Sequence, residues 1–294
     1  MAVNLNVTTS LYSPSLRMAP TAQVLPRGRC DIQFGLDATR CGIFTVPAPA
    51  KPARVRAVLT RMRTPTPRTK LHDDLTSAGL TAHVAAALID DLTSFNILTP
   101  ARSITVAVLG RTPLAHAVAD LLSSYGLGAV LPGPTDSDTA FIVAAHRMGW
   151  LMVVTDKLGC SLRLAPHLAR WHDTWVPVQV IDSQGLVGPV RINGAGACPM
   201  CFDLHRSRID PQWYTVAGGI GADGSRRQDP IAVAATAAAA ARVILELVGM
   251  PNPPGLSPLG LRPGDVAVAK PYEAVASQRI RLAQHPECPV CFFS

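Results

Sequence analysis

Three stretches near the start of the chain place apolar residues every three or four positions. "PARVRAVLTRMR" carries one such stripe and "RTKLHDDLTSAGL" follows it. Residues 81–98, "TAHVAAALIDDLTSFNIL", repeat the stripe behind Thr81, a residue type that caps helices, so three short helices are predicted. Before them, "DIQFGLDATRCGIFTV" has two runs of β-branched and aromatic residues around turn-forming Gly and Asp, which predicts a β-hairpin. A hairpin with three helices is typical of a winged-helix domain, predicted here over residues 30–100 after an extended lead-in, residues 1–29.

The remainder of the chain alternates continuous apolar runs with helical patterns. "SITVAVLG" followed by "RTPLAHAVADLLSSYGLGAVL" indicates strand, turn, helix and short strand, the opening of a doubly wound α/β fold. "TAFIVAAH" (139–146) predicts another buried strand, "WVPVQVIDSQGLVGPVRI" two strands around a turn, and residues 231–248 a long helix. "VAVAKPYEAVASQRIRL" is part strand and otherwise ambiguous. We therefore predict an α/β domain of Rossmann type over residues 103–294.

The 231–248 helix raises the question of a membrane, because the 294-residue chain is 48% hydrophobic with a mean hydropathy of +0.23. That helix is mostly alanine, which contributes little transfer free energy, and its Arg242 and Glu246 are costly in lipid. A buried helix of a soluble protein is the better interpretation. The start of the chain also lacks the basic and apolar blocks of a secretory signal peptide, so we expect a cytoplasmic protein with reduced thiols.

Positive charge is concentrated in the predicted winged-helix region. The net charge is +7, and the first 102 residues hold 12 Lys and Arg against 6 Asp and Glu. This excess favours an acidic partner, either nucleic acid or an acidic peptide, although a basic run can also be a solvated helix face. No aromatic residue interrupts the basic run at 51–70 to stack on bases, which makes nucleic acid the weaker alternative.

Four of the seven cysteines form two Cys-x-x-Cys pairs, "CPMC" and "CPVC". Each pair supplies two soft ligands from one tight turn, and two pairs together match the tetrahedral coordination of Zn²⁺. Their wide separation in the sequence suits a clasp between distant segments. We predict one structural zinc site formed by Cys198, Cys201, Cys288 and Cys291, with redox-active or merely buried thiols as the alternatives. The remaining cysteines, Cys30, Cys41 and Cys160, show no partner pattern and are interpreted as core thiols.

Polar residues follow the first Cys-x-x-Cys pair closely. His205, Arg206 and Asp210 are residue types that serve in acid–base chemistry, but they lie close in sequence to two predicted thiolates. Arg and His can offset sulfur charge, and Asp can hold the Arg. We interpret the three residues as support for the zinc site; Asp210 with Pro211 also indicates a helix start or a turn.

A dinucleotide-type fold with two distant Cys-x-x-Cys pairs resembles the ThiF/MoeB superfamily of ubiquitin-activating type. The finer resemblance is to the cyclodehydratase partner proteins of thiazole/oxazole-modified (bacteriocin-type, RiPP) peptide biosynthesis. It rests on "GLVGPVRINGAGACPMCFDLHRSRIDPQW", on the closing "HPECPVC", and on "IQFGLDATRCGIFTV" before three helices. The resemblance covers about residues 25–294, close to the whole chain.

In that family the N-terminal domain is similar to a peptide clamp that binds the leader of a ribosomal precursor peptide as an added strand. The resemblance implies an edge strand at Ile43, Phe44 and Val46, with the helix at 81–98 as the other wall. Arginines such as Arg54 and Arg61 would then steer an acidic leader. The alternative from a different class is a winged-helix regulator that binds DNA.

The segment after the first strand of the second domain departs from an active adenylating enzyme. "VLGRTPLAHAVADLL" has only Gly110 where nucleotide phosphates need several glycines, and no acid is evident for the ribose or for magnesium. The resemblance then implies a non-catalytic scaffold without nucleotide, which presents the peptide to a separate YcaO-type enzyme. A stand-alone adenylating enzyme is the alternative. ThiF relatives often dimerise, so we expect a homodimer.

Overall fold

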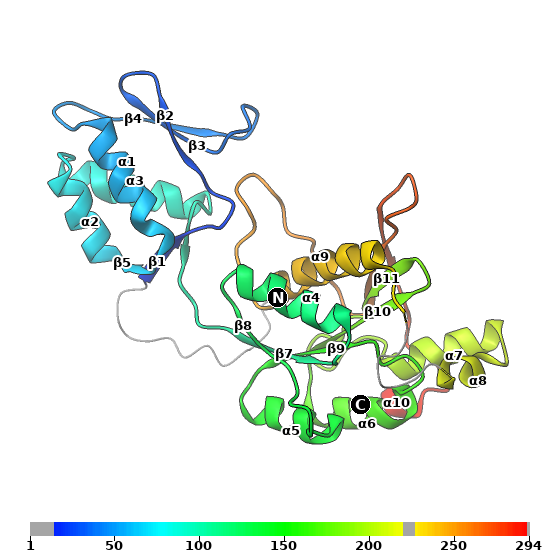
Figure 1. Cartoon of the computed structure of the whole chain (residues 1–294). Coiled ribbons are helices and arrows are strands. Elements are labelled where there is room, and N and C mark those ends of the chain that lie inside the picture. The colour runs from blue at the N-terminus through cyan, green and yellow to red at the C-terminus, as the bar shows by residue number, and fades with distance from the viewer. Residues whose placement is uncertain (1–14, 220–226, 293–294) are drawn as a thin grey trace. The chain divides into compact units, whose positions relative to one another are not determined.

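The computed structural model describes residues 15–219 and 227–292 (Figure 1). The chain divides into two compact units. Among the described residues, the N-terminal unit comprises 15–102 together with the segment 251–258, and the larger unit comprises the rest. The chain therefore leaves the larger unit after residue 250 and returns to it at residue 259.

Two small antiparallel sheets and three helices make up the N-terminal unit. One sheet has the order β5-β1-β6, formed by β1 (Ser15–Met18), β5 (Thr66–Pro67) and β6 (Leu98–Pro100). The other has the order β2-β3-β4, formed by β2 (Val24–Arg27), β3 (Asp31–Phe34) and β4 (Gly42–Thr45). The helices are α1 (Pro52–Thr60) with the 3₁₀ turn η1 (Arg61–Arg63), α2 (Arg68–Ser77) and α3 (Ala82–Ser94). One apolar core joins both sheets to all three helices.

The hairpin and the three helices that the apolar pattern predicts are present in this unit. Thr81 caps α3 as expected, because its hydroxyl accepts a hydrogen bond from the backbone N–H of Val84. The third helix is shorter than the predicted 81–98. It ends at Ser94, Asn96 adopts a left-handed φ of 56°, and the chain continues as β6. The apolar residues at the end of the predicted helix pair instead with β1, a partner far away in the sequence.

A mixed seven-stranded sheet forms the centre of the larger unit, in the order β13-β12-β11-β10-β9-β7-β8. The parallel part consists of β7 (Thr105–Leu109), β8 (Gly128–Val130), β9 (Leu151–Thr155) and β10 (Trp175–Ile181). The antiparallel extension consists of β11 (Gln184–Val187), β12 (Asp265–Ala269) and β13 (Ser277–Arg281). The strands β7, β9 and β10 are almost fully buried, which accounts for their continuous apolar sequences.

Helices cover both faces of this sheet (Figure 1). On one face, α4 (Pro113–Ser124) and α9 (Pro230–Leu247) pack against residues such as Val106 and Val153. On the other, α5 (Asp138–Arg147) and α6 (Ser161–Trp171) pack against alternate residues of the same strands, such as Ala107 and Val154. The helices α7 (Pro199–Ile209), α8 (Trp213–Gly218) and α10 (Pro289–Phe292) complete the unit. The predicted α/β class is confirmed as a mixed α/β fold.

Residues 139–146, predicted as a buried strand, form most of helix α5 instead. Ser137 caps this helix by accepting a hydrogen bond from the backbone N–H of Ala140. Phe141, Ile142 and Ala145 then recur on its buried face. The strand prediction was wrong because a short apolar run does not distinguish a strand from a buried helix, and the capping serine lies just outside the run.

The helix α9 is long and apolar enough to cross a bilayer, with 18 residues and a mean hydropathy of 1.6, and no other described helix is. It packs within the core of the larger unit, against α4 and the sheet. It lies so close to β11 that a Cβ added at Gly185 of that strand would collide with Thr236 of the helix. These contacts support the interpretation of α9 as a core helix.

Candidate metal centre and strand edge

The two Cys-x-x-Cys pairs meet in the larger unit. Cys198 is the N-cap of α7 and Cys201 lies in its first turn, whereas Cys288 precedes α10 and Cys291 lies within it. The four Sγ atoms lie within 4.8 Å of one another. The fold therefore brings together four thiols from two segments that are distant in the sequence.

The spacing of these sulfurs suits a metal ion. The Sγ–Sγ distances are 3.9 Å for Cys198–Cys201, 3.6 Å for Cys198–Cys288 and 3.5 Å for Cys201–Cys291. A disulfide would need about 2.05 Å. A tetrahedron with Zn–S bonds of about 2.3 Å has edges of roughly 3.8 Å. The four cysteines could hold a metal ion, and four thiolates are a donor set that zinc favours.

The charges within the cluster also favour a cation. Three of the thiols are buried and Cys291 is half-buried. The neighbouring Cys201 and Cys291 side chains, together with burial, raise the pKa of Cys198 well above its usual range. Hydrogen bonds from Cys198 and Cys201 lower the pKa of Cys291. The Cys291 thiolate is thus stabilised while Cys198 resists ionisation, and a divalent cation would offset the repulsion between further thiolates.

A buried cation, Arg191, contacts the cluster. Its side chain is 2% exposed, and Nη1 donates to Cys291 Sγ at 3.6 Å and to the Gly196 carbonyl at 3.2 Å. A backbone bridge to Trp175, the first residue of β10, fixes its position. Arg191 belongs to no sequence motif, and only the fold brings it to a sulfur 100 positions away.

The three residues predicted to support the metal site have separate roles. His205 Nε2 lies 3.0 Å from a backbone carbonyl of the segment that leads to α10, so it links the two halves of the cluster. The Arg206 guanidinium lies over the rings of Phe202 and Trp213, at 5.1 and 5.6 Å from their centroids. Asp210 is the C-cap of α7, and its carboxylate accepts from a backbone N–H two residues on. Arg206 and Asp210 therefore pack and terminate α7.

The turn between β7 and α4, where an adenylating enzyme would need glycines, is held by internal contacts. Arg111 Nη2 donates to two backbone carbonyls of the loop 133–136, at 2.8 and 2.7 Å. Thr112 Oγ1 accepts from the first turn of α4 and donates to the Asp156 carboxylate at 2.6 Å. The polar side chains of this turn are therefore already engaged by the chain itself.

In the N-terminal unit, β4 lies at one edge of its sheet, and no other strand of the described chain pairs with its outer side. Ile43 is 52% exposed, Phe44 is half-buried, and Val46 is buried in the core. The accessible part of the predicted edge is therefore Ile43 and the backbone of β4. Arg54 on α1 and Arg61 in η1 are both exposed.

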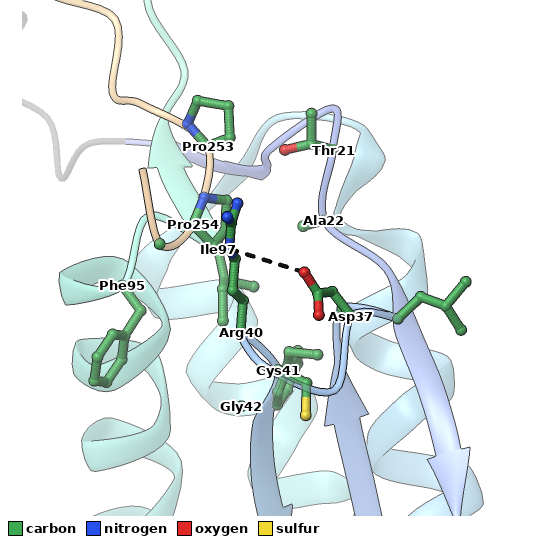
Figure 2. A pocket seen from close by; sticks show the side chains of 14 residues that line it. Thr21, Ala22, Asp37, Arg40, Cys41, Gly42, Phe95, Ile97, Pro253 and Pro254 are labelled. Carbon is green, nitrogen blue, oxygen red and sulfur yellow. Dashed lines mark ion pairs between the residues drawn. The ribbon is translucent and has the colours of Figure 1, made fainter. Parts of the chain in front are cut away.

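A cavity of about 560 Å³ adjoins the start of β4 (Figure 2). Its walls come from the turn between β3 and β4, from residues 21–22, from the end of α3, and from residues 253–255. No sequence motif indicates this cavity, because four separate segments contribute to it. It lies entirely within the N-terminal unit.

The mixed α/β arrangement is one that the chain shares with solved heterocyclase structures. It is similar to a heterocyclase in complex with substrate and cofactor (TM-score 0.53, 16% identity, covering 95% of this chain and 39% of that chain). It is also similar to the heterocyclase TruD (TM-score 0.52, 14% identity, covering 95% and 43%). The match to Escherichia coli MccB with MccA has a TM-score of 0.46 at 13% identity, covering 95% and 99%.

The likenesses to the two heterocyclases show a shared fold at low sequence identity. The chain spans 39% and 43% of the length of the two heterocyclases. No family model and no curated protein matches the sequence.

Proposed function

We propose that this chain is a non-catalytic, zinc-stabilised scaffold that binds the leader of a ribosomal precursor peptide and presents it to a separate YcaO-type cyclodehydratase. The observation that carries the proposal is the accessible edge of β4. An edge strand offers unpaired N–H and C=O groups, to which an extended peptide adds as a further strand.

The surroundings of this edge suit an acidic peptide. Arg54 and Arg61 are exposed on the same unit, whose sequence carries most of the net positive charge of the chain. Such charges raise the rate at which an acidic peptide finds the edge, and the effect weakens as salt increases. The exposed Ile43 offers an apolar contact on the outer face of the strand.

The larger unit supports a structural role. Zinc bound by four thiolates has no open coordination position, so it would join α7 to α10 and supply no Lewis acid to a substrate. The turn after β7 engages Arg111 and Thr112 in contacts with the chain itself, which argues against nucleotide binding there. The fold shared with heterocyclases, one of them in complex with substrate, is consistent with a part in peptide modification. The cyclisation chemistry is assigned to another chain.

Calorimetry with the leader of a Cys/Ser/Thr-rich precursor peptide encoded beside the gene tests the proposal. We expect binding that weakens with salt, and slower amide hydrogen exchange at residues 42–45 in the complex. Ile43→Glu should weaken binding about 10-fold or more through lost apolar contact and charge repulsion. Leu25→Glu is the matched control, because Leu25 occupies the same cross-strand row on the opposite edge.

Two results would overturn this function. One is the absence of binding to any such leader. The other is ATP–pyrophosphate exchange by the purified chain, since exchange would demonstrate an adenylating enzyme and a working nucleotide site.

A further inference from the structure

The cavity beside β4 is open and largely apolar. Its volume of about 560 Å³ lies within the range of about 300–1,000 Å³ that ligand sites occupy. Figure 2 shows Pro253 and Pro254 on one side, Thr21 across from them, and the Asp37–Arg40 ion pair between. The larger apolar side chains that line it are Phe34, Leu36, Phe95, Ile97, Pro253 and Pro254.

Gly42, the first residue of β4, also lines this cavity. It pairs directly with Phe34 on β3, and paired residues of neighbouring strands point to the same face of a sheet. Phe34 is 5% exposed and forms part of the cavity wall. The row of paired residues that contains Phe34 and Gly42 therefore faces the cavity. Gly42 has no side chain, so it leaves the entrance free.

A strand added to β4 continues this row. The peptide residue opposite Gly42 would point to the same face as Phe34, since strand pairing preserves the alternation of side chains. No side chain of β4 stands between that position and the cavity. The neighbouring peptide residues, on either side in the sequence, would point to the outer face beside Ile43.

Residues 253–255, the proline segment, form a wall of the cavity although they are distant in the sequence from the hairpin. A Cβ added at Gly255 would lie 3.5 Å from Arg40 Cδ, so this segment lies beside the turn between β3 and β4. Two consecutive prolines hold the backbone in a restricted conformation and lose little entropy when they contact a ligand.

We propose that a peptide paired with β4 inserts one large apolar side chain, of leucine or phenylalanine size, into this cavity, and that the proline segment helps to select it. The inference rests on the proposed function and deepens it. Selectivity then depends on Gly42, where a large side chain would block the entrance, and on residues 253–255, which lie outside the hairpin and helices.

The structure supplies a graded test at Gly42. A Cβ there would be 4.0 Å from its nearest neighbour, and its φ is not left-handed, so Gly42→Ala should fold and should weaken binding much less than a larger side chain does. Gly42→Leu extends a side chain into the entrance of the cavity. The probes are peptides selected for binding to the intact chain from a displayed library of random short peptides. Only those peptides are kept whose binding is lost in the Ile43→Glu variant.

We expect one large apolar residue in each such peptide whose replacement by alanine weakens binding about 10- to 100-fold. In Gly42→Leu the parent peptide should bind with the affinity of its alanine derivative, and the alanine replacement should then have almost no further effect. Replacing Pro253 and Pro254 by serine should weaken binding of the parent peptide and leave binding of the alanine derivative unchanged.

Cysteine alkylation gives a second readout. Cys41 is half-buried and lines the cavity, whereas Cys30 is exposed and is not among the cavity residues; the prediction of both as core thiols was wrong, because they flank the strands of an exposed hairpin. The bound peptide should slow alkylation of Cys41 and leave that of Cys30 unchanged.

The outcomes separate the two proposals. Selected peptides that bind at β4 but show no coupling to Gly42 and no protection of Cys41 would overturn the cavity inference and leave the scaffold function standing. If the library yields no peptide sensitive to Ile43→Glu, both are wrong.

Discussion

Arg191 shows how one buried side chain can set the charge of the thiol cluster. Four thiolates with one divalent cation carry a net negative charge, and Arg191 donates a hydrogen bond to Cys291 from a site that is 2% exposed. Charge-assisted hydrogen bonds of this kind are strong where water is excluded. Groups that hydrogen-bond metal ligands tune metal affinity. Arg191 is therefore expected to stabilise the metal-bound form of the cluster.

Replacing Arg191 by methionine keeps much of the apolar stem and removes the charge. We expect Arg191→Met to lower zinc affinity about 10- to 100-fold, and Arg191→Lys to lower it less. Competition with a chromophoric zinc chelator measures both. Arg208→Met makes the same change on the exposed part of α7 and should leave the affinity unchanged. Equal affinities for Arg191→Met and the parent protein would show that the arginine serves packing alone.

At the scale of single residues, functional side chains could be predicted where they belong to a repeated motif, but not where only the fold brings them to the site. The four cysteines could be grouped because Cys-x-x-Cys occurs twice. Arg191 and Gly42 could not be singled out, since an isolated arginine or glycine has many roles. Val46 was grouped with the edge strand from its neighbours, yet its side chain is buried in the core.

At the scale of elements, α5 and α6 illustrate how capping and packing decide between helix and strand. Ser137 starts α5, and the buried faces of both helices pack on the same side of the sheet. His172, the C-cap of α6, is 7% exposed and donates its Nε2–H to the carbonyl of Ile142 on α5 at 2.9 Å. The apolar pattern could locate α5 as buried but not its type, because the residues that decide it lie outside the run.

The pair of helices should be sensitive to acid through His172. Burial lowers the pKa of His172 from its ordinary value of 6.5, with a smaller opposing effect from the hydrogen bond to Ile142; His146 lowers it further and Asp173 raises it. The folded chain therefore keeps this imidazole neutral, whereas the unfolded chain takes up the proton as pH falls through 6.5. Stability from this residue is present above that pH and is lost on acidification.

Denaturant unfolding between about pH 7.5 and 5.5 tests this expectation against His172→Gln, which keeps a donor for Ile142 but does not titrate. The free energy of unfolding should fall more steeply with acid in the parent protein than in the variant. Subtracting the two profiles removes the contribution of the other histidines. Parallel profiles would contradict the assignment.

At the scale of the whole molecule, the thiol cluster links α7 to the C-terminal segment of the described chain. None of the four residues of α10 is fully buried, so its own side chains provide little apolar anchoring. Cys288 is buried, His205 contacts the segment before it, and Gln284 donates to the Gly196 carbonyl at 3.2 Å. Four sulfur bonds to one ion would far exceed these contacts in free energy.

Removal of the metal should therefore loosen one part of the chain and leave another unchanged. Under reducing conditions with a zinc chelator, we expect faster hydrogen exchange at residues 196–204 and 284–292, because both segments lose their shared anchor. Exchange at β3 and β4 should not change, since the N-terminal unit has its own core. The melting temperature should fall by at least about 5 °C, the shift expected for a loss of a few kcal/mol in a domain of this size.

Cys291→Ser should reproduce both effects without chelator, whereas Cys160→Ser, a half-buried thiol outside the cluster, should reproduce neither. A Cys291→Ser protein that melts like the parent and exchanges like it at 284–292 would show that the four thiols do not act as one metal site.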